Sequence, residues 1–284
     1  MKEYCDLHCH STFSDGTDTP EQLLRQAEAL GLSAIALTDH NTVAGLPAFL
    51  EAAKGYDVEA VPGTEFSTVW RGIELHILGL FLKPEHFETV TQKLEVYNQR
   101  KEQSNVDLVR ALEAGGYHLD YEKIKASTPN GQVNRALIAA ELTRLGYTQS
   151  NQEAFKKLLN PSRGYYTPPQ RFTPFEIIVF IKSLGAVAVW AHPLLSLNPQ
   201  QARDFLREVQ GHGLDGMEVF YSTYDGETTK TACALAEEFG LAYSGGSDYH
   251  GHNKPDIRMG AGKGDLAIPT AFLDGLKAIF EKQK

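Results

Sequence analysis

The chain has 284 residues, 42% of them hydrophobic and 22% charged, which is typical of a soluble globular protein with one large domain or two ordinary ones. We find no run of about 18 apolar residues, so no membrane span is predicted. The net charge of −9 argues against a general nucleic-acid binder, which needs a basic surface, but it allows a small phosphorylated substrate held locally by arginines and cations. Three cysteines and no visible secretory signal predict a cytoplasmic protein without disulfides.

Short apolar runs alternate with helical runs along most of the chain. Residues 4–10 form the first predicted strand, and a helix then begins at Thr19, where Thr19 and Gln22 can form a capping box. Repeated strand-then-helix units predict a parallel sheet, either open or closed into a barrel. Later strands are expected at 33–37, 58–61, 73–80, 186–190, 216–220 and 241–244, with further helices at 43–54 and 269–284.

The stretch from about residue 84 to 167 breaks this rhythm. Its pattern is almost wholly helical, and it contains no convincing buried strand. We therefore interpret residues 98–167 as a small helical insertion, a substrate cap, within an α/β body made of residues 1–97 and 168–284.

The first strand carries a possible metal-binding pair. Alternate side chains on a strand share a face, so Asp6, His8 and His10 are expected to point the same way. Imidazoles about 7 Å apart along one strand can converge on a single cation. Taken alone, two half-buried structural histidines are an equally good interpretation.

Similar residues occur at or near the ends of later strands. Asp15 lies in a turn and alone would be an ordinary turn residue, and His76 lies inside a strand, where a buried structural histidine is the usual interpretation. Six imidazoles and three carboxylates converging on one barrel mouth would repel one another without cations. The full set is His8, His10, Asp15, His40, Glu65, His76, His192, Asp248 and His250.

The chemistry of this set indicates the kind of metal. Nitrogen and oxygen ligands without thiolate suit manganese, zinc or iron. Nine ligands are too many for one ion but about right for three divalent ions, each with some positions filled by water or by bridging groups.

At these residues the sequence resembles the PHP family, named for polymerase and histidinol phosphatase. The resemblance implies a distorted (β/α)7 barrel with its metal site at the carboxyl ends of the strands. It also implies that Glu65 bridges two ions, one held with His8, His10 and Asp248 and the other with His76 and His192, while Asp15, His40 and His250 hold a third. It rests on Asp6–Ser11, Thr38–His40, Gly63–Glu65, His76, Ala191–Pro193 and Gly246–Gly251.

The insertion resembles that of the PHP phosphatases that act on nucleotides, including nucleoside 3′,5′-bisphosphates. In that subgroup a Gly-Arg-Pro-His segment opens a helix that ends in Gly-Tyr; here the segment is Asn134-Arg135-Ala136-Leu137, which shares only the arginine, and the end is Gly146-Tyr147. Asn41 stands where the subgroup commonly has Asp. Arg135 and Arg163 are the candidate phosphate-binding residues, because a guanidinium matches phosphate geometry.

The expected reaction is metal-assisted hydrolysis of a small phosphomonoester, with a nucleotide as substrate and a metal-bridging hydroxide attacking phosphorus. Glu65 is the expected bridging residue, and the proton donor is either a metal-bound water or His192. Two alternatives remain open: a histidinol-phosphate phosphatase with the same metal site, and a non-catalytic PHP module that binds a nucleotide or a partner protein. The second alternative predicts the loss of ligands, whereas all nine are present.

Overall fold

A computed structural model describes residues 3–126, 133 and 135–283 of the chain. These residues form two compact units, which we call the barrel unit (Met1–Thr91 and Phe172–Lys284) and the helical unit (Gln92–Arg171). The sequence predicted domain boundaries at residues 98 and 167. That these residues limit independently folding domains stays a prediction. No helix in the described part of the chain has the length and apolar character needed to cross a membrane.

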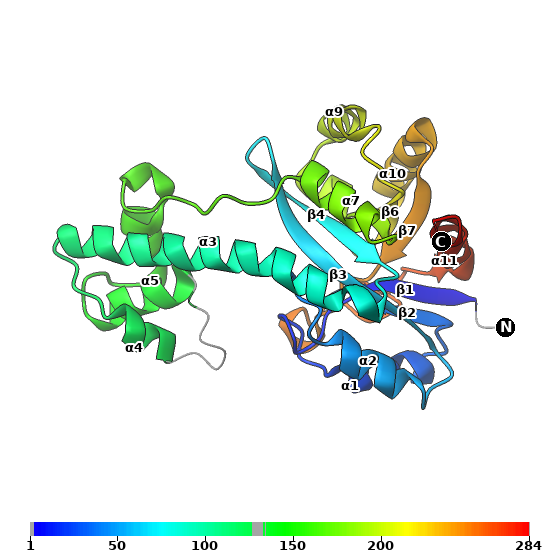
Figure 1. The fold of residues 1–284 in the computed structure, drawn as a ribbon, viewed down its shortest axis with the longest axis horizontal. Helices are drawn as coiled ribbons and strands as arrows, with labels where there is room; N and C mark the ends of the chain where they lie inside the picture. The colour runs from blue at the N-terminus through cyan, green and yellow to red at the C-terminus, as the bar shows by residue number, and fades with distance from the viewer. Residues whose placement is uncertain (1–2, 127–132, 134, 284) are drawn as a thin grey trace. The chain divides into compact units, whose positions relative to one another are not determined.

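The barrel unit is built on one eight-stranded sheet in the order β7-β6-β5-β4-β3-β2-β1-β8 (Figure 1). Neighbouring strands are parallel except at β3–β4, β4–β5 and β1–β8. The backbone N–H of Asp248, just after β7, donates to the carbonyl of His8 in β1 at 2.9 Å, so the sheet nearly closes on itself. The strands are β1 (Tyr4–Cys9), β2 (Ala34–Leu37), β3 (Glu59–Trp70), β4 (Ile73–Leu80), β5 (Val187–Ala191), β6 (Gly216–Tyr221), β7 (Ala242–Gly246) and β8 (Ile268–Pro269).

This architecture confirms the predicted α/β barrel, with one difference at β3. The strand was expected to end at Val61, because Pro62 and Gly63 usually terminate strands. Instead it continues to Trp70 and pairs with β4 as an antiparallel hairpin. Gly63 is needed there, since a Cβ atom at this position would lie 2.9 Å from the carbonyl oxygen of Gly79. The hairpin makes β4 antiparallel to both of its neighbours, β3 and β5, and so distorts the mainly parallel barrel.

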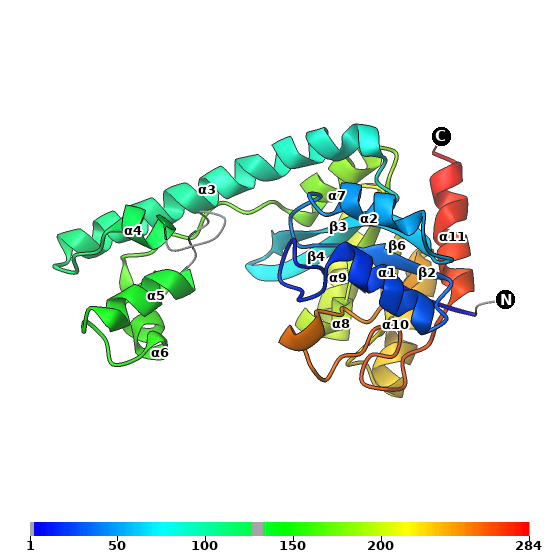
Figure 2. The same ribbon diagram turned by 90° about the horizontal axis from the view of Figure 1, so that it is seen from below.

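Helices cover the outside of the sheet, and α1 and α2 pack side by side (Figure 2). The predicted capping box is confirmed: the N–H of Gln22 donates to Thr19 Oγ1 at 3.3 Å, and the N–H of Thr19 donates to Gln22 Oε1 at 2.7 Å. The helices of the barrel unit are α1 (Pro20–Ala29), α2 (Leu46–Ala53), α7 (Pro174–Ser183), α8 (Pro193–Ser196), α9 (Pro199–Val209), α10 (Gly226–Phe239) and α11 (Thr270–Glu281).

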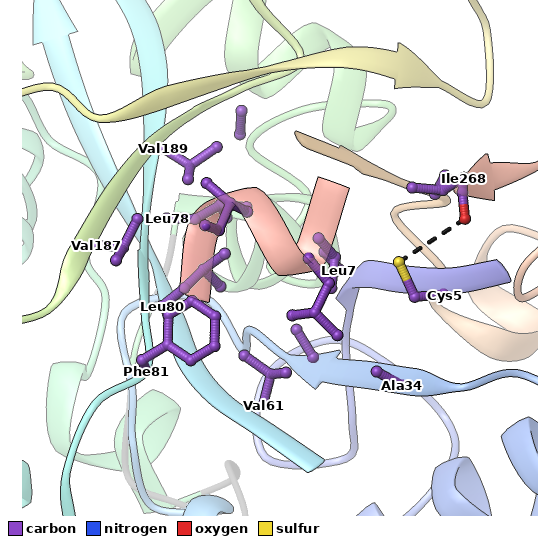
Figure 3. Close-up of a cluster of buried hydrophobic side chains, with 14 residues drawn as sticks. Cys5, Leu7, Ala34, Val61, Leu78, Leu80, Phe81, Val187, Val189 and Ile268 are labelled. Atoms are coloured by element: carbon purple, nitrogen blue, oxygen red, sulfur yellow. Dashed lines mark hydrogen bonds between the residues drawn. The ribbon is translucent and has the colours of Figure 1, made fainter. Parts of the chain in front are cut away.

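Apolar side chains from several strands and from α11 form a buried core cluster in the barrel unit (Figure 3). Leu7, Leu78 and Val189 are fully buried and come from strands that are distant in the sequence. Leu273 and Leu276 of α11 join the same cluster. Burying each such side chain contributes about 1.5–3 kcal/mol, so this core is the frame that fixes the strand ends.

The helical unit has its own core, formed by residues such as Leu112, Ile138 and Leu159. The predicted helical pattern is confirmed, since the described residues of this unit contain no strand. Asn134, which was expected to open the insertion helix, lies outside the described residues, and the helix is described from Arg135. The elements are α3 (Phe87–Ala114, which begins in the barrel unit), α4 (Tyr121–Ala126), α5 (Arg135–Arg144), α6 (Asn151–Ala154), a π-helical turn (Phe155–Leu159) and a 3₁₀ turn (Pro161–Arg163).

Candidate metal centre

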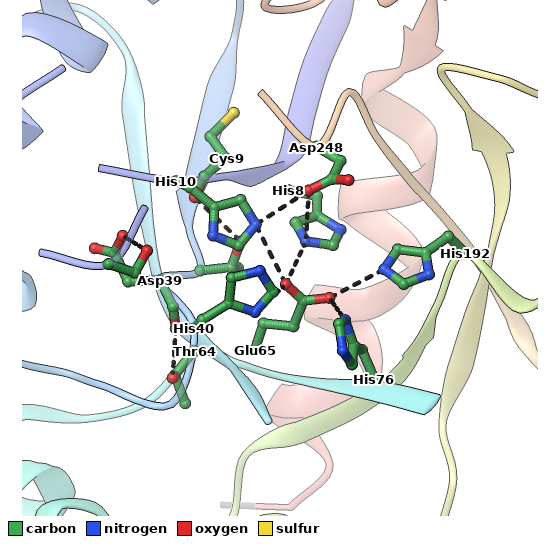
Figure 4. A network of polar contacts seen from close by, with 12 residues as sticks. His8, Cys9, His10, Asp39, His40, Thr64, Glu65, His76, His192 and Asp248 are labelled. Atoms are coloured by element: carbon green, nitrogen blue, oxygen red, sulfur yellow. Dashed lines mark hydrogen bonds and ion pairs between the residues drawn. The ribbon is translucent and has the colours of Figure 1, made fainter. Parts of the chain in front are cut away.

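Glu65 lies at the middle of the polar centre, and its carboxylate is fully buried (Figure 4). Its Oε2 atom is 3.1 Å from His8 Nε2, 3.2 Å from His10 Nε2 and 3.0 Å from His40 Nδ1. The sequence analysis placed Glu65 just beyond a strand end. It lies instead within β3, because that strand continues past Pro62.

The other oxygen of Glu65 faces a different pair of histidines. Oε1 is 2.7 Å from His76 Nδ1 and 3.1 Å from His192 Nε2. His76 comes from β4 and His192 from the residue after β5. One carboxylate therefore has imidazoles on both sides, as a bridging ligand requires.

Two further carboxylates complete the centre. Asp248 Oδ1 lies 3.2 Å from His10 Nε2. Asp15 Oδ1 lies 3.2 Å from His250 Nε2, and Asp15 Oδ2 lies 3.9 Å from His40 Nε2. The half-exposed side chain of Asp15 marks the side of the centre that reaches solvent.

The potential ligand atoms fall into three overlapping groups, each with its atoms within 4.8 Å of one another. The first group has the same four members as the first predicted set. The second contains His40 where His192 was expected, and the third also contains His10. The groups are His8, His10, Glu65 and Asp248; His40, Glu65 and His76; and His10, Asp15, His40 and His250.

The buried atoms of the centre fit bound cations. Among the described residues, eight buried side-chain nitrogen or oxygen atoms have no hydrogen-bond partner. Five of these eight belong to Glu65, His8, His10 and His40, which are all members of the clustered ligand groups. Buried polar atoms in proteins are nearly always satisfied by hydrogen bonds, and binding of an ion is one standard reason for exceptions. Nitrogen and oxygen donors of this kind suit a divalent transition metal.

Comparison with known proteins agrees with this geometry. The family model described as "PHP domain" matches residues 6–165, which is more than half of the chain. The chain belongs to the PHP family. The PHP chain is 33% identical over 251 residues to the "5'-3' exoribonuclease" of Haemophilus influenzae, covering 88% of this chain and 91% of the relative.

Other relatives carry different names. The "Phosphoribosyl 1,2-cyclic phosphate 1,2-diphosphodiesterase" of Eggerthella lenta is 31% identical, over 87% of this chain and 94% of the relative. The "3',5'-nucleoside bisphosphate phosphatase" of Chromobacterium violaceum is 27% identical, over 86% of each. A solved structure from Bifidobacterium adolescentis, assigned as a metal-dependent phosphoesterase, has a TM-score of 0.72 and 27% identity, covering 97% of this chain and 96% of that one. This PHP chain is a metal-dependent phosphoesterase.

The charges of the PHP centre strongly perturb its titrating groups. Burial alone would raise the pKa of Glu65, but the neighbouring histidines His8, His76 and His40 outweigh it and hold that pKa well below its usual range. Burial opposes a charge on His76, yet the Glu65 carboxylate raises the pKa of His76 to about 10. Burial lowers the pKa of His40 to about 4. In the metal-free protein, protons on imidazole thus take the place of metal charge.

Strained backbone accompanies the ligands. Asn41, His192 and Asp248 have positive φ angles of 49°, 32° and 57°. His192 also precedes Pro193, a position that disfavours helical backbone angles, and its ψ is 54°. Each such residue costs about 1–3 kcal/mol and persists only where the surroundings hold it. The strain aims the His192 ring and the Asp248 carboxylate at the centre.

Buried carboxylates outside the predicted set hold the loops that carry the ligands. Asp39 accepts hydrogen bonds from the Ser11 N–H at 2.7 Å, from Ser11 Oγ at 2.6 Å and from Ser14 Oγ at 2.6 Å, which fixes the loop between His10 and Asp15. In the sequence, the signal for Asp39 was a charged residue just after an apolar strand.

Asp6 was expected to share a face with His8 and His10, and its buried carboxylate belongs to none of the three groups of potential ligand atoms. Its carboxylate accepts from the N–H of Ser247 at 2.9 Å and of Gly260 at 2.7 Å. The pairing of β1 with β2 shifts register between Asp6 and Cys9, and this irregularity interrupts simple alternation.

The two candidate phosphate-binding arginines lie in the helical unit and have different surroundings. The Arg135 guanidinium is 4.5 Å from the ring centre of Tyr166 and 5.7 Å from that of Phe155. Arg163 is exposed, and its Nε donates to the carbonyl of Lys156 at 3.2 Å. Arg135 lines a cavity, and Arg163 is not among the residues that line it.

Proposed function

We propose that this PHP enzyme hydrolyses a phosphomonoester of a nucleotide, a nucleoside monophosphate or a 3′,5′-bisphosphate. The observation that carries the proposal is the buried Glu65 carboxylate with five imidazoles within 3.2 Å. We further propose three bound ions, of manganese, zinc or iron. When bound, such ions lower the pKa of water and neutralise charge on phosphoryl oxygens.

The residues of the chain have separate tasks in this scheme. Glu65 offers one oxygen to each side of the centre and so spaces the ions. Tyr221 donates its hydroxyl to Asp248 Oδ2 at 2.8 Å, which leaves Asp248 Oδ1 to face the histidines. His192 is our candidate for the proton donor to the leaving group, since it contacts Glu65 but belongs to none of the three clustered groups.

A cavity of about 290 Å³ in the helical unit supports a nucleotide substrate. Its lining holds the cationic side chains of Lys101, Arg135 and Arg171 and no carboxylate. Three aromatic rings, those of Tyr97, Phe155 and Tyr166, also line it. Cationic groups bind phosphate and aromatic rings stack on bases, so this combination suits a nucleotide better than a simple sugar phosphate.

A second candidate substrate is the 5′ end of RNA. The Haemophilus influenzae relative and the "5'-3' exoribonuclease Rnm" of Escherichia coli are 33% and 34% identical to this chain. The same cationic and aromatic cavity would serve one nucleotide of a strand. The net charge of −9 weighs against a long polymer, so the expected absence of a nucleic-acid substrate stays a prediction.

A release assay with added manganese tests these candidates together. The substrates are a nucleoside 5′-monophosphate, a nucleoside 3′,5′-bisphosphate, a 5′-phosphorylated oligoribonucleotide and histidinol phosphate. We expect the highest kcat/KM on one of the two mononucleotides, with phosphate as a product. Release of mononucleotides from the oligoribonucleotide would favour the RNA candidate, preference for histidinol phosphate would favour that alternative, and no turnover on any substrate would favour the non-catalytic module.

A further inference from the structure

Glu218 lies in the middle of β6, a strand that supplies none of the nine proposed metal ligands, and its side chain is fully buried. Its two oxygens contact two ligand residues from other strands. Oε1 is 2.9 Å from His8 Nδ1, and Oε2 accepts from the backbone N–H of His192 at 2.7 Å. Gly246 leaves room for this arrangement, because a Cβ atom there would lie 2.1 Å from the Cβ of His8.

The geometry determines which atoms donate. His8 Nε2 faces Glu65 Oε2 at 3.1 Å and has no hydrogen-bond partner, so it is the nitrogen available to a metal. His8 Nδ1 must then carry the hydrogen and donate it to Glu218. The backbone N–H of His192 is also a donor. Two donors converge on one side chain, and a carboxylate can accept from both.

We propose that Glu218 is a positioning residue that fixes the tautomer of His8, so that its ring is pre-set for metal, and holds the strained backbone of His192, so that its ring faces Glu65. This inference rests on the metal centre of the proposed function. It concerns how the ligands are oriented and not which phosphoester is cleaved. Carboxylates in this position commonly change metal affinity by about 10- to 100-fold when they are removed.

Glu218→Gln is the informative change, because it keeps the size of the side chain and replaces one acceptor by a donor. If the amide oxygen faces His192, the NH₂ group faces His8 Nδ1 and selects the tautomer with the hydrogen on Nε2, which cannot bind metal. If the amide is turned round, its NH₂ group faces the His192 N–H, and two donors oppose each other. Either orientation disturbs one ligand.

The experiment measures manganese dissociation constants and the ¹⁵N shifts of the His8 ring in zinc-loaded protein. We expect Glu218→Gln to bind manganese about 10- to 100-fold more weakly and to change the protonation pattern of His8. Asp215→Asn is the matched control: Asp215 accepts from the N–H of Ala188 at 2.9 Å, at the other end of the strand that leads to His192. The control should keep wild-type metal affinity.

Glu218→Asp serves as the conservative variant. It keeps two acceptor oxygens, so it should retain the hydrogen on His8 Nδ1 and lose less affinity than Glu218→Gln. Should the Gln variant fail to fold, the Asp variant decides, and loss of the Nδ1 hydrogen there overturns the proposal. Wild-type affinity with an unchanged His8 pattern in Glu218→Gln also overturns it. Neither measurement needs a substrate, so inactivity on every phosphoester would overturn the proposed function alone.

Discussion

In the barrel unit the imidazoles and carboxylates face one another in the interior, whereas in the helical unit the charged side chains lie at the surface or line a cavity. Glu65 and His8 are fully buried and share their contacts. The ion pair of Arg144 with Glu141 in the helical unit joins neighbouring turns of one helix and has a solvent-exposed arginine, so it contributes little to stability. Changes in the barrel centre should therefore have much larger effects than changes in the helical unit.

The two units also differ in their proposed tasks, which are bond cleavage in the barrel unit and substrate recognition in the helical unit. Buried, mutually fixed ligands suit bond cleavage, because a preorganised site loses nothing to rearrangement during the reaction. A cationic cavity suits recognition, where the choice of substrate depends on a few side chains. The following experiments test this division.

Removal of the metals should have the largest effect. Dialysis against a chelator should abolish turnover and lower the melting temperature, because it removes metal ions that bind the folded protein but not the unfolded chain. Added manganese should restore both. Elemental analysis of the protein before chelation should give more than one divalent ion per chain, approaching three. A single ion per chain with no gain in activity on adding metal would contradict the three-ion centre.

Glu65→Gln should lower kcat by at least ~10²-fold, since the amide removes the charge shared by both sides of the centre. Glu59→Gln is the matched control, because Glu59 begins the same strand and its exposed carboxylate pairs with Lys277. Steady-state kinetics with metal analysis of each variant provide the measurement. An unchanged kcat with full metal content in Glu65→Gln would remove Glu65 from the site.

Arg135→Ala should lower kcat/KM. The corresponding loss of transition-state stabilisation should be roughly 1.5–3 kcal/mol, the usual loss when a hydrogen bond to a charged group is removed. We expect a lower kcat if Arg135 holds the phosphate that is cleaved, and a higher KM for a bisphosphate alone if it holds a second phosphate. Arg163→Ala should have a smaller effect, because Arg163 is not among the residues lining the cavity.

Arg144→Ala is the control on the same helix, since Arg144 is exposed and pairs with Glu141. Kinetics on a mononucleotide and on a bisphosphate separate the two roles of Arg135. Wild-type constants on both substrates in Arg135→Ala would make it a surface charge and would weaken the nucleotide proposal.

The last prediction concerns metal affinity, which should depend on pH. In the metal-free centre the carboxylates raise the pKa values of His8 and of His76, the latter to about 10, so near neutral pH a metal must displace their protons. Below these pKa values both sites already carry protons, so metal binding releases them and weakens by about tenfold for each pH unit lowered and each proton released. His40, with its pKa lowered to about 4, should not contribute above ~pH 5. Manganese titrations at ~pH 6 and ~pH 8 test this expectation, and equal affinities would refute it.

The sequence predicted the positions that strand periodicity controls. His8 lies in β1 and His10 directly after it, and His40 and His192 follow apolar strands, so their side chains meet where strands end. The role of Glu65 as a ligand stays a prediction, and its place along the strand was predicted wrongly, because Pro62 and Gly63 suggest a strand end whereas tertiary pairing with β4 extends the strand.

Local sequence patterns could not predict the residues that support the candidate ligands and Arg135. Glu218 contacts His8 across 210 positions of sequence, and only the closed sheet brings β6 behind β1. Its one local signal was a charged residue inside an apolar strand, which implies a buried partner but does not identify it. In the same way, the aromatic partners of Arg135 depend on the packing of the helical unit.

The left-handed backbone at His192 and Asp248 limits how far this enzyme can be stabilised by engineering. Glycine would relieve the unfavourable φ angle at either position, but it would also delete the side chain that the angle serves. Natural enzymes commonly keep such local instability where activity requires it. A search for thermostable variants should therefore find gains on the outer helices and losses of turnover wherever it relaxes these two residues.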